Sequence, residues 1–441
     1  QYCVTTSTTC TPNININAGN TEASYNYTFG TASSAQRVCA TSTDVVGNNT
    51  GIKCSEAYKV DVTKPTISNM SASVNNKTIN ISVNATDVGS GGLTYYYSID
   101  GGRNYTSSTS NTYSVTVGAG TYSIYTYVVD SAGNQSAVKT TSVDIKNVLK
   151  DIILANSPTI TSRADFSTTF TSTTTGTLYT AADDYGTSYY FAGNPTDNWV
   201  KFGGFYWRII RINGDGTIRM IYNGTTTDQT GETTQIGTSV FNSTGSDNVH
   251  IGYQYIIGQV HGNGTNSAIK EVLDNWYNSN LANYSNYIAT GGGATFCNDR
   301  QPSTDKSSIN GSGGTGTKVT YYPAFIRVMS SKVPTLKCAD TRDRFTTPVG
   351  LITADEVNYA GAVYGTANNS YYLYSGNYYW TMSPSEYSFG SANVYTVRSN
   401  GRLCPYNVAS ARGARPVINL KADTTTFASG NGTSSNPYVV A

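Results

Sequence analysis

Two adjacent carboxylates, Asp355 and Glu356, are the residues in this sequence that could form an acid–base pair. Thr353 stands three positions before Glu356, which is the spacing of a helix capping box. Neighbouring helix positions also point in different directions. We therefore interpret both acids as structural residues at the start of a helix from Thr353 to Ala360, which Gly361 ends.

Other patterns that carry catalysis or bind a cofactor are missing from the sequence. The two histidines, His250 and His261, lie in a stretch rich in Gly and Asn without partnering motifs. There is no Ser-His-Asp set, phosphate-binding loop or C-x-x-C pair. We expect a protein that is not an enzyme, with no cofactor, no metal site and no catalytic residue.

The seven cysteines predict disulfides in an oxidising compartment. Cys3 with Cys10 and Cys39 with Cys54 would each close a hairpin, and Cys297 with Cys338 is a plausible pair further along. Cys404 is left over and is either a free thiol or an intermolecular link.

A hairpin from Trp199 to Gly224 is the element expected at the centre of the large domain, because it is the densest apolar and aromatic stretch. The turn 213–216 reads Asn-Gly-Asp-Gly, which suits the positive φ of tight hairpins. An unbroken register would pair Trp207 with Tyr222, Ile209 with Met220 and Arg211 with Ile218. Both faces are half apolar, so we expect the hairpin to be covered on both sides. Its three arginines, Arg208, Arg211 and Arg219, then need partners near a core.

Composition narrows the class of protein. Only 12% of the 441 residues are charged and the net charge is +1, which argues against nucleic-acid binding. No run of about 18 apolar residues occurs, so no membrane span is predicted in this chain. No signal peptide is visible, and we expect that an N-terminal segment was removed. Asn-x-Ser/Thr sequons that would allow glycosylation include Asn26, Asn76, Asn80, Asn84, Asn223 and Asn431.

An internal repeat organises the first third of the chain. The pattern Asp-x-x-Gly-Asn-x-Ser/Thr begins at Asp44 and again at Asp130, each time after an alternating strand. We interpret it as a hairpin turn rather than a calcium site, because too few carboxylates converge in the sequence. The second copy is complete, with strands expected at 66–70, 78–85, 93–99, 113–117, 122–129 and 138–145. That spacing is typical of an immunoglobulin-type sandwich.

Two further helices are predicted after the repeats. Residues 147–156 form a short helix with Asn147 as its cap, and residues 157–188 read as an extended lead-in. The stronger helix runs from Ser267 to Asn280. Its apolar residues recur at helical spacing on one face: Ile269, Val272, Leu273, Trp276 and Tyr277.

The segments Tyr95–Gly102 and Asp61–Thr66 resemble a strand hairpin and an inter-domain linker of immunoglobulin-like repeats on Gram-positive surface proteins. The resemblance covers about residues 1–147. It implies a partial immunoglobulin-like domain at 1–62, whose N-terminal strands are missing, and a complete one at 63–147. Either the protein continues upstream or another chain supplies the missing strands.

The large domain resembles a second family, also found in secreted and surface proteins of Gram-positive bacteria. The motifs that carry this resemblance are FGGFYWRIIRINGDGTIRMIYNG, IKEVLDNWYNSNL with FCNDR, VGLITADEV, YYWTMSP, ARPVINLKAD and GNGTSSNPYVV. The closing pattern of Trp380–Pro384, the Asn400-Gly401 hairpin and Gly413–Val417 resembles C-type lectin-like domains, whose fold the formylglycine-generating enzymes share. Those enzymes need a redox cysteine pair, whereas Cys404 stands alone, so the resemblance does not imply their chemistry.

These resemblances imply a mainly β, multidomain fold: immunoglobulin-like β-sandwiches, a short helix and extended linker at 148–188, and an α+β C-type lectin-like domain at 189–441. In such folds the loops near the C-terminal strands bind the ligand. The positions that correspond are Ser385, Glu386, Tyr387, Phe389, Asn393, Tyr395, Arg398, Tyr406, Asn407, Ser410 and Arg412. Arg415 and Pro416 precede an apolar strand and are expected to be structural.

Two functions follow as expectations. The first is an extracellular adhesin or ligand-binding protein on the surface of a Gram-positive bacterium, with an immunoglobulin-like stalk and a lectin-like head. Its partner would be a glycan or protein ligand on another surface. The second is a structural subunit of an extracellular filament or surface layer, which would bind copies of itself.

Overall fold

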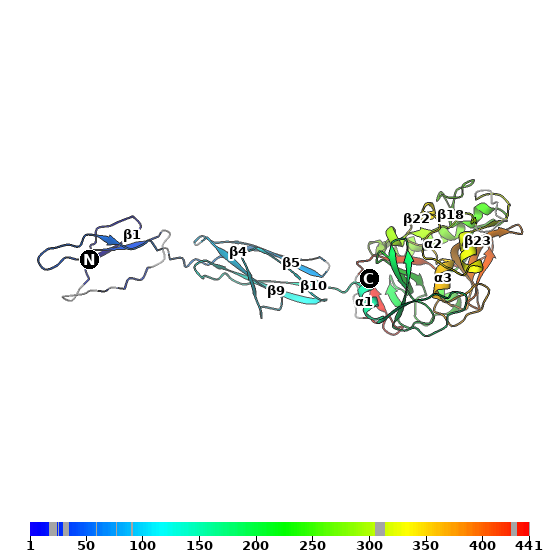
Figure 1. Cartoon of the computed structure of the whole chain (residues 1–441), viewed down its shortest axis with the longest axis horizontal. Helices are drawn as coiled ribbons and strands as arrows, with labels where there is room; N and C mark the ends of the chain where they lie inside the picture. Colours follow the sequence, from blue (N-terminus) through cyan, green and yellow to red (C-terminus); the bar gives the residue numbers. More distant parts are fainter. Residues whose placement is uncertain are drawn as a thin grey trace. The chain divides into compact units, whose positions relative to one another are not determined.

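The computed structural model describes residues 1–16, 24, 26–29, 35–58, 60–75, 77–89, 91–304, 314–424 and 430–440. The chain divides into two compact units, Gln1–Ile145 and Lys146–Ala441 (Figure 1). The fold is mainly β, as the sequence predicts, and the α-helices of the described residues all lie in the second unit. No helix in these ranges has the length and hydrophobicity that a membrane crossing requires.

The first unit begins with a small antiparallel sheet in the order β1-β2-β3, formed by Tyr2–Thr5, Arg37–Ala40 and Lys53–Cys54. Disulfides join Cys3 to Cys10 and Cys39 to Cys54, which confirms both predicted pairs. Such links stabilise a segment that buries little apolar surface.

Residues 66–145 form a two-layer sandwich, which confirms the immunoglobulin-type prediction. One layer has the order β4-β5-β8, formed by Thr66–Asn75, Thr78–Thr86 and Thr112–Thr116. The other has the order β10-β9-β6-β7, formed by Lys139–Ile145, Gly120–Asp130, Leu93–Ser98 and Thr106–Ser108. Alternating residues of the two layers, among them Ile79, Ile81, Tyr97, Ile124 and Val128, fill the core between them.

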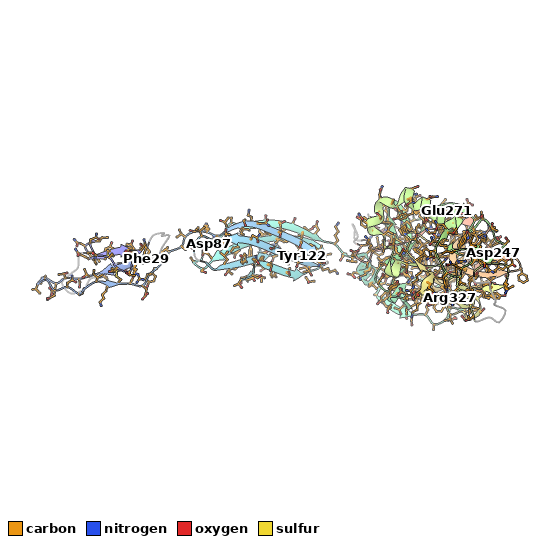
Figure 2. The ribbon with its side chains drawn as sticks, turned by 90° about the horizontal axis from the view of Figure 1, so that it is seen from above. Phe29, Asp87, Tyr122, Asp247, Glu271 and Arg327 are labelled. Atoms are coloured by element: carbon orange, nitrogen blue, oxygen red, sulfur yellow. A yellow bond between two sulfur atoms is a disulfide. The ribbon has the colours of Figure 1, made fainter. Side chains whose placement is uncertain are left out.

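The repeated motif forms the predicted turn in both copies. The Oδ1 atom of Asp130 accepts from the backbone nitrogens of Ala132 and Asn134, and Asp44 binds Val46 and Asn48 in the same way. The statement that too few carboxylates converge at this turn was wrong, however. Carboxylate oxygens of Asp61, Asp87 and Asp130 lie within 4.8 Å of one another, so more carboxylates converge here than the local sequence shows. Asp87 marks this end of the sandwich, away from Tyr122 (Figure 2).

The described residues of the second unit form two main sheets and three α-helices. The first sheet has the path β11-β12-β13-β15-β14-β28, with β16 and β27 continuing from β15. Its strands are Thr159–Ser162, Thr177–Asp183, Gly186–Tyr190, Phe205–Ile212, Trp199–Phe202 and Tyr438–Val440, then Ile218–Tyr222 and Val417–Leu420. The second sheet has the path β17-β26-β23-β24-β25, with β21 beside β23. Its strands are Thr238–Ser239, Arg412–Gly413, Tyr379–Ser388, Ser391–Val397, Leu403–Asn407 and Thr320–Tyr321.

Two short strand pairs complete the β structure: β18 (Gln254–Tyr255) with β19 (Thr265–Asn266), and β20 (Phe296–Cys297) with β22 (Arg344–Phe345). The helices are α1 (Leu149–Ala155), α2 (Ala268–Asn280) and α3 (Ala354–Ala360). Ser267 caps α2, and a capping box of Thr353 and Glu356 begins α3, which Gly361 ends at φ 129°. Val272 of α2 is 37% exposed, so it lies off the buried face predicted for it.

The central hairpin, β15 with β16, is buried on both faces, as predicted. Its register differs from the prediction beyond Ile209. A bulge between Ile209 and Arg211 shifts the pairing, so Arg211 faces Arg219 and not Ile218. In the turn, Gly216 has a positive φ. Gly214 is required for a different reason, because a Cβ atom at this position would collide with Asp183.

The segment at 148–188 is more than the short helix and extended linker predicted from its composition. Leu149 and Ile153 of α1 are fully buried in the main core of the second unit, and β12 and β13 join its first sheet through β15. Helix α1 begins after Val148 without a side-chain cap, because Asn147 lies one position too early to serve as the predicted cap. These strands are rich in Thr and Ser, so they lack the alternation of apolar residues by which a strand is recognised in a sequence.

Sequon residues differ in how accessible they are. Asn76 lies outside the described residues. Asn223 is only 7% exposed, and its Oδ1 accepts a hydrogen bond from Arg415. Its amide therefore serves the core of the second unit rather than offering a glycosylation site.

If α1 belongs to the second unit, then Ile153→Ala should lower that unit's free energy of unfolding by about 3 kcal/mol, because it opens a cavity in the core. All four tryptophans of the chain lie in this unit, so tryptophan fluorescence during urea unfolding of the full chain measures it alone. The control Val272→Ala, at a half-exposed site, should change stability by less than about 0.5 kcal/mol. Equal effects of the two substitutions would show that α1 does not pack as described.

Candidate functional site

A buried ion network joins the central hairpin to helix α3. The Nε of Arg211 donates to Oε1 of Glu356 at 3.0 Å, and its Nη1 donates to Oδ2 of Asp183 at 3.1 Å. The Nε of Arg219 lies 2.7 Å from the same Glu356 oxygen. Each of these four side chains is more than nine-tenths buried. For Arg211 and Arg219, the predicted need for partners is therefore met by acids from two other elements.

The pKa of Glu356 reflects this pairing. Burial alone would raise it, but the charges of Arg219 and Arg211 and the hydrogen bond from the backbone of Thr353 outweigh burial and hold the pKa below its usual value of 4.5. The carboxylate thus stays ionised while it completes the capping box. This confirms the structural interpretation of Glu356 and adds two ion pairs to it.

Asp355, the other member of the carboxylate pair, faces a different arginine. Arg327, labelled in Figure 2, donates to Asp355 and also lies 2.5 Å from Asp299. Burial raises the pKa of Asp299, although Arg327 opposes the change. The disulfide between Cys297 and Cys338, predicted from the sequence, lies beside Asp299.

These charged residues line a narrow cleft that opens to solvent. Five acids and five bases face it, including Asp184, Lys337 and Arg344 at its rim. The buried acids Asp183, Asp299, Asp355 and Glu356 each contact a guanidinium group. Their contacts are those of a charge-balanced network of buried acids and arginines.

Replacing Glu356 by Gln should lower the free energy of unfolding by about 3 kcal/mol at pH 7, because it leaves two buried arginines short of an anion. Because the folded-state pKa is depressed, the contribution of the carboxylate is complete above pH 4.5 and is lost as the pH falls through the folded-state value. The difference in free energy of unfolding between the variant and the native chain should therefore become smaller as the pH falls into the acid range. Urea unfolding followed by tryptophan fluorescence over this pH range measures this difference.

The control for that series is Glu271→Gln, at an exposed site in the first turn of α2 (Figure 2). It should change stability by less than about 0.5 kcal/mol at every pH. A Glu356→Gln penalty that stays constant down to acid pH would contradict the described ion pairs.

Three of the predicted ligand-binding residues are buried, and for them the prediction was wrong. Ser385 and Tyr395 are fully buried, and Tyr387 is 2% exposed with its hydroxyl donating to the carbonyl of Ser246. Strands β23 and β24 are covered on both faces, so the outward alternation on which the prediction depended is absent. These side chains stabilise the second sheet and cannot contact a ligand from solvent.

The other predicted residues separate into two groups on the β23–β24–β25 layer. At the end where β23 turns into β24, the residues are Glu386, Phe389, Asn393, Asn407 and Ser410. Glu386 accepts from the hydroxyl of Ser385, and both Asn393 and Asn407 hydrogen-bond to Ser391. Phe389 is fully exposed at φ 49°. The side chains of Glu386, Asn393 and Asn407 are thus engaged in local contacts.

In the second group, Arg398, Tyr406 and Arg412 come together, and Tyr378 joins them. The guanidinium carbon of Arg412 lies 3.9 Å from the ring centre of Tyr406 and 4.9 Å from that of Tyr378. That of Arg398 lies 5.5 Å and 6.0 Å from the same two rings. We call these four residues the Arg–Tyr surface. Stacking on rings holds the guanidinium groups in place without neutralising their charge.

Arg402, which lies across the turn from Arg398, adds a third positive charge near this surface. The backbone nitrogen of Arg398 donates to the carbonyl of Arg402 across the Asn400-Gly401 turn. The Nε atoms of Arg398, Arg402 and Arg412 are buried without a hydrogen-bond partner, and no ion pair joins these arginines to an acid among the described residues. The surface is therefore suited to an anionic partner.

Sequence reasoning missed Tyr378 and Arg402. Arg402 could have been found by pairing residues across the predicted Asn400-Gly401 hairpin, which places it opposite Arg398. Tyr378 could not have been found from the sequence. It precedes β23, and its ring lies 6.2 Å from that of Tyr406 in β25, a contact between strands that the sequence does not reveal.

Cys404 is a free cysteine and only 8% exposed. Of the two alternatives left open by the sequence, burial favours the free thiol over an intermolecular link. In the native chain it should resist a thiol-reactive dye, and unfolding in urea without reductant should expose one reactive thiol per chain. Rapid labelling of the folded protein would contradict this placement.

Comparisons with known proteins give no family for this chain. No family model matches it, and no curated protein matches it. Solved structures that resemble parts of it include the PKD1 domain of Vibrio anguillarum Epp, with 20% identity over 19% of this chain and 95% of that chain, at a TM-score of 0.15. Domains d3–d4 of the rat CD45 extracellular region match with 14% identity over 31% and 78%, at a TM-score of 0.19.

A third resemblance is to chitinase ChiA74 from Bacillus thuringiensis, with 16% identity over 42% of this chain and 23% of that chain, at a TM-score of 0.17. TM-scores this low carry no argument about fold or function. The functional reasoning below therefore depends on the chain's own residues.

Proposed function

We propose that this chain is an extracellular ligand-binding protein of the adhesin type, in which the second unit binds a partner and the first unit serves as a spacer. The three disulfides are typical of proteins outside the cytosol, which supports a secreted or surface location. The Gram-positive origin and the C-type lectin-like character of the second unit remain part of this proposal, on the sequence motifs given above.

The observation that carries the proposal is the Arg–Tyr surface. Arg398 and Arg412 lie over the rings of Tyr378 and Tyr406, with Arg402 beside them and no acidic partner in the described residues. Rigid aromatic rings provide contact area at low entropic cost, and stacked guanidinium groups donate to carboxylates, sulfates or phosphates. The favoured partner is an anionic group on a glycan or a protein.

Binding without catalysis is also part of the proposal. It is supported by the buried acids of the charged cleft, each of which contacts an arginine. The alternative of a structural filament subunit drew on Cys404 as an intermolecular link, and the burial of Cys404 removes that support. We therefore retain the binding function as the better-supported one.

The test is binding of the full chain to a glycan array and to an array of extracellular proteins. Arg398→Ala together with Arg412→Ala should lower retention on anionic ligands about tenfold, because it removes two charge-assisted contacts. Retention by the native chain should also weaken as salt is raised.

The matched control is Arg342→Ala, which removes an exposed arginine that pairs with Asp340 elsewhere in the same unit. It should retain native binding. If the native chain binds nothing on either array, or if the double variant binds as well as the native chain, the proposed function is wrong.

A further inference from the structure

A second concave site in the second unit lies outside both the charged cleft and the Arg–Tyr surface. It contains about 820 Å³ of empty space open to solvent. Trp199 of β14, Arg208 of β15 and the segment from Asn369 to Ser375 form its walls, and residues 227–230 form part of its rim. We call it the tyrosine pocket, after Tyr371, Tyr372 and Tyr374.

Aromatic rings surround a guanidinium group in this pocket. The guanidinium carbon of Arg208 lies 4.3 Å from the ring centre of Trp199 and 5.3 Å from that of Tyr372. Trp199 is 7% exposed and Tyr372 is 4% exposed. The guanidinium group covers a face of each ring, so these rings offer mainly their edges to the pocket.

Arg208 differs from the arginines of the ion network because no acid forms an ion pair with it among the described residues. Its Nε donates to Asn198 and its Nη2 donates to the carbonyl of Pro195. Nη1 has no protein partner in the described ranges. Arg208 is 8% exposed, and burial lowers its pKa to about 9, so it is still charged at neutral pH. The charge of Asp197 acts on Arg208 without a direct ion pair, so an anion in the pocket that contacts the guanidinium group would add to its stabilisation.

Tyr372 contributes a second unsatisfied donor. Its hydroxyl is buried and has no hydrogen-bond partner in the described part of the chain. By contrast, the hydroxyl of the neighbouring Tyr371 donates to the carbonyl of Gly401. Buried polar groups are normally hydrogen-bonded, so an orphan hydroxyl lining a cavity indicates a missing acceptor.

The rim is polar and holds one acid. Amide and hydroxyl side chains of Asn194, Thr230, Asn369 and Ser370 line it, and these groups suit the hydroxyls of a sugar. Asp228 also lies on the rim, where it accepts from the hydroxyl of Thr226. Because Asp228 is in contact with water, its charge is screened more strongly than that of buried Arg208.

We propose that the tyrosine pocket binds a sugar that carries a carboxylate, of the uronic-acid class. The carboxylate contacts Nη1 of Arg208 and the hydroxyl of Tyr372, and the sugar ring packs on the exposed aromatic edges. The inference rests on the proposed function only in assigning a ligand-binding role to this unit, and the site is separate from the Arg–Tyr surface.

The experiment is calorimetric titration of the full chain with methyl β-glucuronide and, separately, with methyl β-glucoside, which differs by having CH₂OH in place of the carboxylate. The glucuronide should bind about tenfold more tightly, because only it offers an anion to Arg208. Tyr372→Phe should weaken glucuronide binding about fivefold through the loss of one hydrogen bond.

Tyr190→Phe is the matched control, because the hydroxyl of Tyr190 is also buried without a partner but lies away from the pocket. Since neither hydroxyl has an internal partner, both variants should keep or slightly raise the melting temperature. A purely structural role for Tyr372 thus predicts no change in binding.

Equal affinity for the two sugars, failure of the native chain to bind the glucuronide, or unchanged binding by Tyr372→Phe would each overturn the proposal. The double variant at Arg398 and Arg412 should bind the glucuronide as the native chain does. If this double variant loses array binding but still binds the glucuronide, the Arg–Tyr surface and the tyrosine pocket are separate binding sites. An array without any retained ligand would contradict the proposed function while leaving the pocket to be judged by the titration.

Discussion

The second unit depends on the pairing of Glu356 with Arg211 and Arg219. These two arginines belong to the central hairpin of the core. Other elements pack on both faces of this hairpin, so both arginines are buried. A charge in such a place must be neutralised or the hairpin cannot be buried. Glu356 meets this need from the first turn of α3, where it also caps the helix. One side chain thus fixes the position of a helix against a sheet.

Two groups of arginines in this unit differ in their partners. Arg211, Arg219 and Arg327 lie against acids, and they hold sheets, a helix and a disulfide-linked loop together. Arg208, Arg398, Arg402 and Arg412 lie against aromatic rings or in a hairpin, and no acid pairs with them in the described residues. Charges of the first group are already balanced by the fold, whereas those of the second remain available to an anion. The proposed binding sites consist of arginines from the second group.

Local chemistry in the sequence was enough to predict several elements. The capping box at Thr353, the sandwich strands, the three disulfides and the burial of the central hairpin all depend on residues close in sequence or on simple alternation. Contacts between distant segments were not predictable in this way. Asp183, Arg211 and Glu356 meet although they are widely separated along the chain, and the bulge at Ile210 changes the register in a way that alternation cannot reveal.

The predicted ligand surface failed in part for a related reason. Tyr395 and Ser385 belong to strands covered on both faces, so polar or aromatic character did not indicate exposure there. Arg398, Tyr406 and Arg412, which the sequence placed on that surface together with the buried residues, do come together in the structure. The tyrosine pocket was missed altogether, since its walls come from three separate stretches of the chain and its signal is an unpaired donor, which only coordinates can show.

The most direct test of the central claim, that Arg208 and Tyr372 of the tyrosine pocket bind an anion, is a crystal structure of the full chain with saturating methyl β-glucuronide. We predict that the sugar occupies the tyrosine pocket, with its carboxylate within hydrogen-bond distance of Arg208 and of the Tyr372 hydroxyl. An empty pocket, or a sugar whose carboxylate lies against the acid-paired arginines of the charged cleft, would contradict the account.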